Sequence, residues 1–274
     1  MLQNYLSSCD SHEKLKVGGQ REVYRAVHHI LGQIVVKHAK CSSTLSIERL
    51  GRESKFLKEL DTPCFPKLHD LVIDPSSMEC LVIEEFIPGQ ELSESAGNYH
   101  DENSIVSLLR RLVSCLSIVW DRRVVHRDLK PANIIIRPDD SPVIIDFGIA
   151  RFLDEKSLTW SMAHVGPGTP WYAAPEQLEN KKQQIDARTD FFALGVICLE
   201  LLLEKHPFSP ELVGGETVPG NILSSKYREP SESDGASPQF QNLICRLLQR
   251  QPFLRFRDHR KLTDFLSANW GLSE

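Results

Sequence analysis

The sequence lacks several patterns that would assign it to a particular class of protein. Its seven cysteines are scattered and none has C-x-x-C spacing, so neither a zinc site nor a disulfide framework is indicated. We therefore expect free thiols and a cytoplasmic location, where the environment is reducing. The sequence also lacks an excess of basic residues, since its net charge is −5. This argues against nucleic acid and against a membrane surface as partners.

Long apolar segments are also missing. The longest one, residues 191–203, contains Glu200; it is too short to span a bilayer and predicts a buried helix. The N-terminus, MLQNYLSSCDSHEK, is too polar for a signal peptide. Repeats, low-complexity tracts and a Walker A sequence are absent, and the last absence argues against a P-loop NTPase. We expect a soluble protein.

What the sequence contains divides it into a strand-rich first part and a helical second part, which join near Pro88-Gly89. In the first part, strands are predicted at 21–28, 32–39 and from 79 on, and a helix at 44–60. In the second part, helices are predicted at 101–123, 189–204, 238–249 and 258–268. The interval 209–237 is rich in Gly, Pro and Ser, and it predicts a loop with at most one short helix.

The strongest chemical signal comes from the motifs V-V-H-R-D-L-K-P-A-N and V-I-I-D-F-G. The first places Asp128, Lys130 and Asn133 on a short turn, and the second places Asp146 at the end of a strand. Asn133 and Asp146 offer the hard oxygen ligands that Mg²⁺ prefers. Asp128 can orient a hydroxyl group and accept its proton, and Lys130 can contact a γ-phosphate.

These motifs resemble the catalytic loop, H-R-D-L-K-P-x-N, and the metal-binding loop, D-F-G, of the eukaryotic-like (Hanks-type) Ser/Thr protein kinases, and the chain looks like a bacterial member. The resemblance covers about residues 12–268. It implies an α+β, bilobal kinase domain over 1–274, with a β-rich N-lobe at about 12–87 and a helical C-lobe at about 88–270. It also implies ATP and Mg²⁺ (or Mn²⁺) as cofactors, protein Ser/Thr hydroxyls as acceptors, and a monomer or weak dimer.

The resemblance extends upstream to residues that would hold the nucleotide. I-V-V-K places Lys37 where the family has the lysine that holds the α- and β-phosphates. Glu53 in the following helix is its expected partner, with Glu48 and Glu59 as competitors. Only the middle glycine of the family's Gly-rich loop is kept, with one more glycine beside it. The other residues implied for nucleotide binding are Val17, Gly18, Gly19, Val23, Val35, Glu85, Ile87 and Ile135.

The segment V-I-E-E-F-I-P-G resembles the family's hinge, V-M-E-Y-V-x-G. This alignment places Glu84 at the gatekeeper position, which is normally apolar or Thr, whereas a slip of one residue would place Ile83 there. A buried glutamate without a partner is costly. Pro88-Gly89 fits the end of the hinge and favours the register with Glu84.

Downstream, G-T-P-W-Y-A-A-P-E resembles the segment that closes the activation loop. Its Thr169, together with the lysine of the catalytic loop, marks Ser/Thr kinases, and in the family this threonine bridges the catalytic Asp and Lys. Glu176 is expected to pair with Arg255, although Gln251 replaces the family's usual Asp. Asp190 is expected to bind the backbone of the catalytic loop.

The resemblance also implies a mode of control. Arg127 precedes Asp128, and in the family that arginine often binds a phosphorylated residue of the activation loop. We expect autophosphorylation at Ser157, Thr159 or Ser161. Two alternatives remain: a small-molecule phosphotransferase of the aminoglycoside type, which has H-G-D and lacks A-P-E, and a pseudokinase scaffold, which the missing glycines favour.

Overall fold

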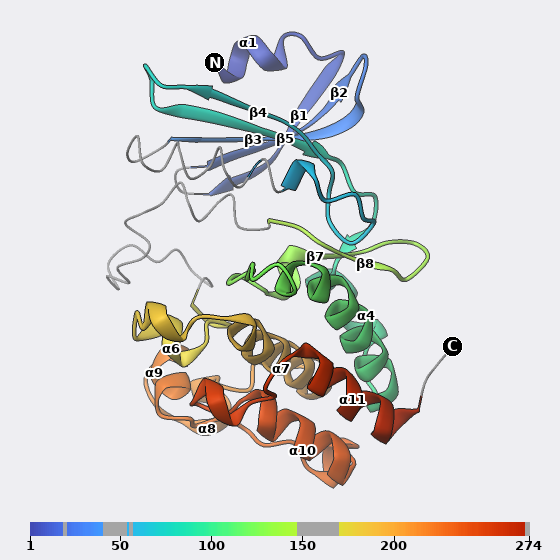
Figure 1. Cartoon of the computed structure of the whole chain (residues 1–274), viewed down its shortest axis with the longest axis vertical. Coiled ribbons are helices and arrows are strands. Elements are labelled where there is room, and N and C mark those ends of the chain that lie inside the picture. Colours follow the sequence, from blue (N-terminus) through green and yellow to red (C-terminus); the bar gives the residue numbers. More distant parts are fainter. Residues whose placement is uncertain (19–20, 41–53, 55–56, 147–169, 272–274) are drawn as a thin grey trace. The chain divides into compact units, whose positions relative to one another are not determined.

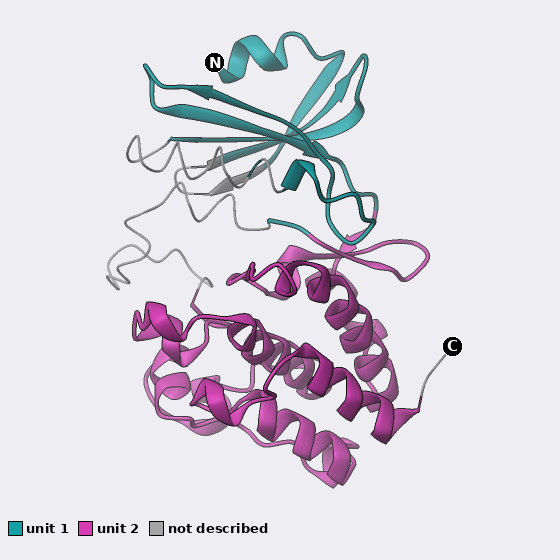
Figure 2. Ribbon diagram, viewed as in Figure 1, with its two compact units in different colours: residues 1–88, 145–161 teal, residues 89–144, 162–274 magenta. Residues whose placement is uncertain are grey.

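Strands dominate the first part of the chain and helices the second, which confirms the α+β class (Figure 1). The computed structural model describes residues 1–18, 21–40, 54, 57–146 and 170–271. The chain divides into two compact units, shown in separate colours in Figure 2. The first comprises residues 1–88 and 145–161, and the second comprises residues 89–144 and 162–274.

An antiparallel sheet of five strands, in the order β1-β2-β3-β5-β4, forms the first unit. The strands are β1 (Ser11–Gly18), β2 (Arg21–His28), β3 (Gly32–Lys40), β4 (Leu68–Asp74) and β5 (Glu79–Glu85). The strands predicted at 21–28 and 32–39 are confirmed, and they form a hairpin in which β2 and β3 pair from Arg21 and Ala39 to His28 and Gly32. Most of the helix predicted at 44–60 lies outside the described residues.

One face of this sheet forms an apolar core. Its buried cluster consists of Leu2, Leu6, Tyr24, Ala26, Ile34, Val36, Leu81 and Ile83. Two of these residues come from helix α1 (Leu2–Leu6), which covers the sheet and which the sequence analysis missed because five residues are too few to show a helical period (Figure 1). Since side chains alternate along a strand, Val35 and Lys37 point to the opposite face.

Helices α4 (Glu102–Trp120) and α7 (Ala187–Leu203) pack against each other in the second unit. Every residue from Thr189 to Leu199 is buried, as the apolar run of this helix predicts. Gly195 lets α10 (Pro238–Leu247) approach closely, because a Cβ at this position would lie 2.7 Å from the Cβ of Leu247. The predictions of helices at 101–123, 189–204 and 238–249 are therefore confirmed.

Shorter helices complete the second unit. They are α3 (Leu92–Ser95), α6 (Pro175–Leu178), α8 (Pro210–Val213), α9 (Val218–Leu223) and α11 (His259–Trp270). The last of them confirms the helix predicted at 258–268. The prediction of at most one short helix in 209–237 is wrong, because Ser209 and Thr217 each cap a helix there that continues with proline at its first or second position.

A small sheet in the second unit, of order β6-β7-β8, frames the catalytic-loop motif. Its strands are β6 (Gln90–Glu91), β7 (Ile134–Ile136) and β8 (Pro142–Ile144). Gly89 precedes β6 and approaches β7 so closely that a Cβ would lie 2.4 Å from the carbonyl oxygen of Ile136. Only glycine leaves room for this contact.

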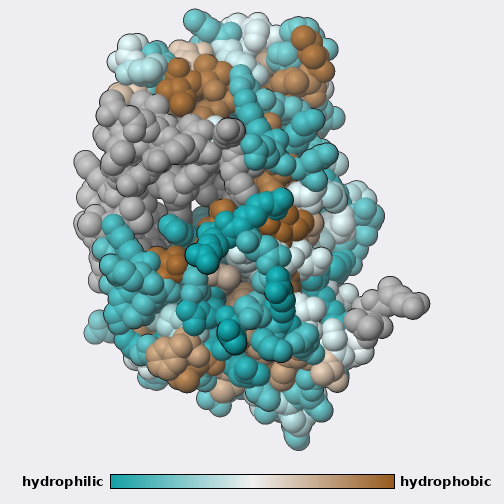
Figure 3. Space-filling view, in the orientation of Figure 1, coloured by the Kyte–Doolittle hydropathy of each residue, from teal (hydrophilic) through white to brown (hydrophobic). Residues whose placement is uncertain are grey.

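Helix α4 is long and apolar enough, by length and composition alone, to cross a membrane. It packs against α7, α11 and β8, and ten of its residues are buried, which is the environment of a core helix. On the face shown in Figure 3, hydrophilic residues cover much of the described surface and hydrophobic residues form scattered patches. Such patches are normal on folded proteins.

The cysteines differ from the expectation of free thiols. Cys64 in the first unit is disulfide-bonded, and so is Cys115 on α4. Among the described residues, Cys9, Cys198 and Cys245 are free thiols. The expectation is therefore wrong for Cys64 and Cys115, because sequence spacing does not reveal which sulfur atoms the fold brings within bonding distance.

Candidate active site

Lys37 of β3 lies between two carboxylates in the first unit. Its Nζ donates hydrogen bonds to Glu84 Oε2, at 2.6 Å, and to the carboxylate of Asp146. Strand pairing sets the first contact, because Val35 lies opposite Glu84 and Lys37 lies opposite Val82, so that Lys37 and Glu84 point from the same face. Burial lowers the pKa of Lys37, but the two carboxylates outweigh it and hold this pKa above its ordinary value.

The same contact decides the register that was left open between Ile83 and Glu84. Ile83 is fully buried in the core on the opposite face of the sheet, whereas Glu84 points to the face of Lys37 with a side chain that is 12% exposed. Glu84 therefore takes the position aligned with the gatekeeper, and Lys37 is its partner. The predicted partner of Lys37, Glu53, lies outside the described residues.

Two of the apolar residues predicted to bind the nucleotide lie on the face of Lys37. Val23 pairs with Lys37 across β2 and β3, and Val35 precedes Lys37 by two residues. Both valines are half-buried, whereas their neighbours Tyr24 and Val36 are buried on the core face. The strand period alone therefore brings these predicted residues together.

The other residues predicted to bind the nucleotide are more dispersed. Val17 and Gly18 end β1, and Gly19 lies outside the described residues. Glu85 ends β5, and its carboxylate accepts a hydrogen bond from the backbone N–H of the residue before β4. Ile87 is buried. In the second unit, Ile135 of β7 is half-buried between two buried isoleucines.

A turn before β7 gathers three of the predicted catalytic and metal-binding residues in the second unit. Lys130 Nζ lies 3.3 Å from Asp128 Oδ2. Asn133 ends the 3₁₀ turn η2 (Pro131–Asn133), and its Nδ2 donates to the carbonyl oxygen of Asp128 at 2.8 Å and to its Oδ2 at 3.2 Å. Because the amide nitrogen of Asn133 makes these bonds, its oxygen Oδ1 is the atom that can ligate a cation.

Asp190 anchors the backbone of this turn, as predicted. Its carboxylate is buried at the start of α7 and accepts hydrogen bonds from the N–H groups of His126, at 2.9 Å, and Arg127, at 2.8 Å. The indole Nε1 of Trp120 donates to the same carboxylate at 2.8 Å. Charge-assisted bonds of this kind are stronger than neutral ones, so Asp190 fixes the segment that leads to Asp128.

Two of the predicted functional residues, one in each unit, have left-handed backbone angles. The φ angle is 68° at Arg127 and 58° at Asp146, a region that residues other than glycine rarely adopt. Gln177, which the sequence analysis missed, helps to hold Arg127, since its Nε2 donates to the Arg127 carbonyl at 2.9 Å. Its one sequence signal is its place directly after A-P-E. Strained backbone of this kind clusters at functional sites.

Glu176 and Arg255 form the predicted ion pair in the second unit. The guanidinium of Arg255 binds both carboxylate oxygens of Glu176, at 2.7 and 2.9 Å, and both side chains are buried. Thr189 Oγ1 donates to the same carboxylate at 2.9 Å. The pair forms although Gln251 replaces the family's aspartate. Its burial and its full set of partners indicate a structural role.

Several predictions lie outside the described residues: Thr169 and the phosphorylation candidates Ser157, Thr159 and Ser161. Within the described ranges, no group of three or more His, Cys, Asp and Glu side chains could hold a metal ion. The two predicted magnesium ligands belong to different units. Each nevertheless has the required chemistry, since both offer a hard oxygen donor.

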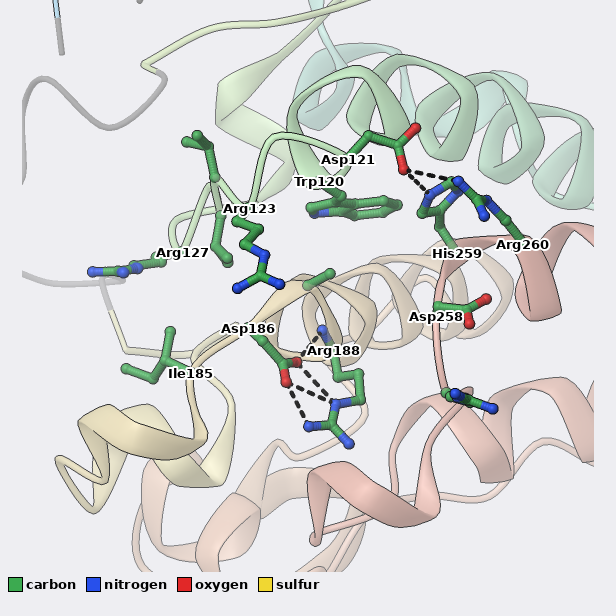
Figure 4. A pocket seen from close by; sticks show the side chains of 14 residues that line it. Trp120, Asp121, Arg123, Arg127, Ile185, Asp186, Arg188, Asp258, His259 and Arg260 are labelled. Carbon is green, nitrogen blue, oxygen red and sulfur yellow. Dashed lines mark hydrogen bonds and ion pairs between the residues drawn. The ribbon is translucent and has the colours of Figure 1, made fainter.

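A cavity of about 580 Å³ opens in the second unit, beside the segment that leads to the catalytic turn (Figure 4). Of the 14 described residues that line it, Arg127 is the one with a role in the sequence analysis. Asp186 pairs with Arg188 there, and Asp121 contacts His259 and Arg260. Five arginines and three aspartates line the cavity, so its lining carries an excess of positive charge, and the predicted nucleotide-binding residues are not among it.

Comparison with known proteins agrees with the geometry. A family model for the protein kinase domain matches residues 10–270. Serine/threonine-protein kinase pkn2 of Myxococcus xanthus is 29% identical over 269 residues, which cover 92% of this chain and 31% of pkn2. Serine/threonine-protein kinase pkn3 of the same organism is 30% identical over 250 residues, which cover 86% of this chain and 45% of pkn3. Serine/threonine-protein kinase ULK3 of Xenopus laevis is 31% identical over 261 residues, which cover 90% of this chain and 53% of ULK3. The chain therefore spans about a third to a half of the length of these relatives.

Proposed function

Because the chain belongs to the protein kinase family, we propose that it transfers the γ-phosphate of ATP to serine and threonine hydroxyl groups of proteins. The cluster of Asp128, Lys130 and Asn133 carries this proposal. It brings a carboxylate, an ammonium group and an amide oxygen together on a turn that Asp190 anchors. Phosphoryl transfer depends on such positioning and charge stabilisation rather than on covalent chemistry by the protein.

Each residue has a distinct role in this proposal. Asp128 orients the acceptor hydroxyl and takes its proton, while Lys130 contacts the γ-phosphate. Lys37 contacts the α- and β-phosphates. Asn133 and Asp146 would hold Mg²⁺ or Mn²⁺, which supplies positive charge to neutralise the phosphate oxygens.

The test is phosphate transfer from labelled ATP, with Mg²⁺, to a generic basic protein. Asp128→Ala should lower kcat by roughly 10²–10⁴-fold, because both the base and the positioning group are lost. Asp146→Ala should abolish transfer. Asp139→Ala is the matched control, since the Asp139 carboxylate accepts hydrogen bonds from Ser141 in its own turn, and this variant should keep wild-type activity.

The other outcomes identify the alternatives. Phosphate on a small-molecule acceptor, with none on protein, would indicate a small-molecule phosphotransferase. Nucleotide binding without any transfer would indicate a pseudokinase. Full activity in the Asp128→Ala variant would contradict the role of Asp128 as base and positioning group.

Further properties belong to the same proposal. We infer autophosphorylation at Ser157, Thr159 or Ser161, and replacing all three by Ala should remove the incorporated phosphate. We also propose that the two units are the two lobes of the kinase domain. We further propose a cytoplasmic monomer or weak dimer that binds neither nucleic acid nor membranes, and the net charge of −5 supports the absence of nucleic acid.

A further inference from the structure

The contact between Lys37 and Glu84 is built into the sheet. β3 and β5 are neighbouring antiparallel strands, and their register places both side chains on one face. The side chains are 19% and 12% exposed, and Nζ and Oε2 lie 2.6 Å apart. Backbone pairing on both sides of the two residues therefore fixes where this carboxylate lies.

The alignment predicts an apolar residue or threonine where Glu84 stands. A carboxylate with so little exposure requires a partner, and Lys37 supplies it. An ammonium group has three N–H donors, and in this structure two of them are directed to Glu84 and Asp146. Within the described part of the chain, these two bonds leave one donor for a phosphate oxygen.

We propose that Glu84 is a positioning residue that holds Lys37 Nζ in the orientation needed to contact the nucleotide phosphates, an inference that rests on the proposed kinase function. Lys37 thus has a partner fixed by strand pairing, in addition to any partner on the helix that carries Glu53. Glu84 acts through Lys37 and contacts no reacting atom. Its identity therefore sets nucleotide affinity and lysine orientation rather than proton transfer.

The first test is the kinetics of Glu84→Gln, which keeps the size of the side chain and removes its charge. We expect kcat/KM for ATP to fall by about 10- to 100-fold, since Lys37 loses one of the two groups that orient it. Glu84→Asp keeps the charge and should recover part of this loss. Glu79→Gln is the control, because this carboxylate lies on the same strand and faces His38 instead, 3.6 Å away. It should keep the wild-type value.

The second test needs no phosphate transfer: the rate at which Lys37 is acylated as a function of pH, measured by mass spectrometry. Losing the charge of Glu84 should make Lys37 react faster and at lower pH, while the exposed Lys40 serves as the internal reference. If Glu84→Gln does not fold, Glu84→Asp is measured in its place; a smaller change in the same direction is expected, because the shorter side chain moves the carboxylate away from Lys37 Nζ. A folded variant with unchanged kcat/KM and unchanged Lys37 reactivity would overturn the proposal. If the wild-type protein transfers no phosphate, the proposed function fails, and acylation still decides the role of Glu84.

Discussion

Two groups of opposite charges, one in each unit, use similar chemistry in different surroundings. Arg255 and Glu176 are 0% and 1% exposed, and the guanidinium also donates to three backbone carbonyl groups. Lys37 is 19% exposed, and its two partners, Glu84 and Asp146, are 12% and 36% exposed. The first group is satisfied entirely within the protein, whereas the second is open to a ligand. Burial and the number of unused donors thus separate a structural ion pair from a functional one.

Removing Arg255 is the strongest way to test this contrast. Arg255→Met leaves the Glu176 carboxylate buried without its counter-charge, so we expect the free energy of unfolding to fall by about 3–5 kcal/mol. Urea denaturation measures it. The control is Arg250→Met, which breaks the half-exposed pair with Glu179 and should cost less than about 1 kcal/mol. Similar losses in the two variants would contradict the distinction.

Removing Lys37 should give the opposite pattern. Lys37→Met eliminates a preorganised cation, and we expect kcat to fall by about 10²–10³-fold. Because Glu84 and Asp146 keep some contact with solvent, the free energy of unfolding should fall by less than the roughly 3–5 kcal/mol expected for a fully buried pair. Steady-state kinetics and urea denaturation together measure the pattern. Lys58→Met removes an exposed pair with Asp70 and should change neither quantity. A large loss of stability in Lys37→Met would show that this group is structural too.

The contrast also shows how far sequence reasoning reaches. Short motifs were enough to find Lys37, Asp128, Asn133 and Asp146. Each of these residues stands at a fixed position in a motif that lies next to an apolar segment. The Glu176–Arg255 pair could be predicted in the same way, although its residues are 79 positions apart. The strands β2, β3 and β5 could be predicted from their β-branched residues, and the long helices from an apolar period of 3.6 residues, whereas β1 and β4 were not predicted.

Contacts without a motif could not be found. The partner that the structure gives Lys37 is Glu84, and the sequence reasoning treated this residue only as a costly carboxylate. The contact depends on the register between β3 and β5, which the sequence does not state. The bond from Gln177 to the Arg127 carbonyl, and the disulfide bonding of Cys64, depend in the same way on how distant segments meet.

His206 sharpens the comparison, since it is a buried ionisable group that forms no ion pair with any described residue. Its Nε2 donates to the Trp171 carbonyl at 3.1 Å, and its Nδ1 accepts from the Phe208 N–H at 3.3 Å, so both ring nitrogens are occupied in the neutral form. Burial lowers the pKa of His206 to about 4, although the bond to Trp171 opposes this effect.

Stability should therefore depend on pH through His206. Between its ordinary pKa of 6.5 and about 4, the unfolded imidazole binds a proton that the folded one does not, so stability falls as the pH decreases through this window. The loss should be roughly 3 kcal/mol. Urea denaturation at several pH values, compared with His206→Gln, isolates this contribution. The exposed His12→Gln should keep the wild-type dependence, and an identical dependence in His206→Gln would refute the assignment.

The smallest effect is expected where an exposed carboxylate binds backbone instead of a cation. Asp101 caps α4 by accepting hydrogen bonds from the N–H groups of Asn103, at 2.9 Å, and Ser104, at 3.1 Å. Asp101→Ala should cost about 1 kcal/mol in the free energy of unfolding, because two N–H groups lose their acceptor. Asp101→Asn keeps the acceptor and should lose only a few tenths of that amount. Both substitutions remove the charge of Asp101, but only Asp101→Ala removes the hydrogen-bond acceptor. Equal losses in the two variants would therefore mean that the charge at this helix end, and not the hydrogen bonds, stabilises α4.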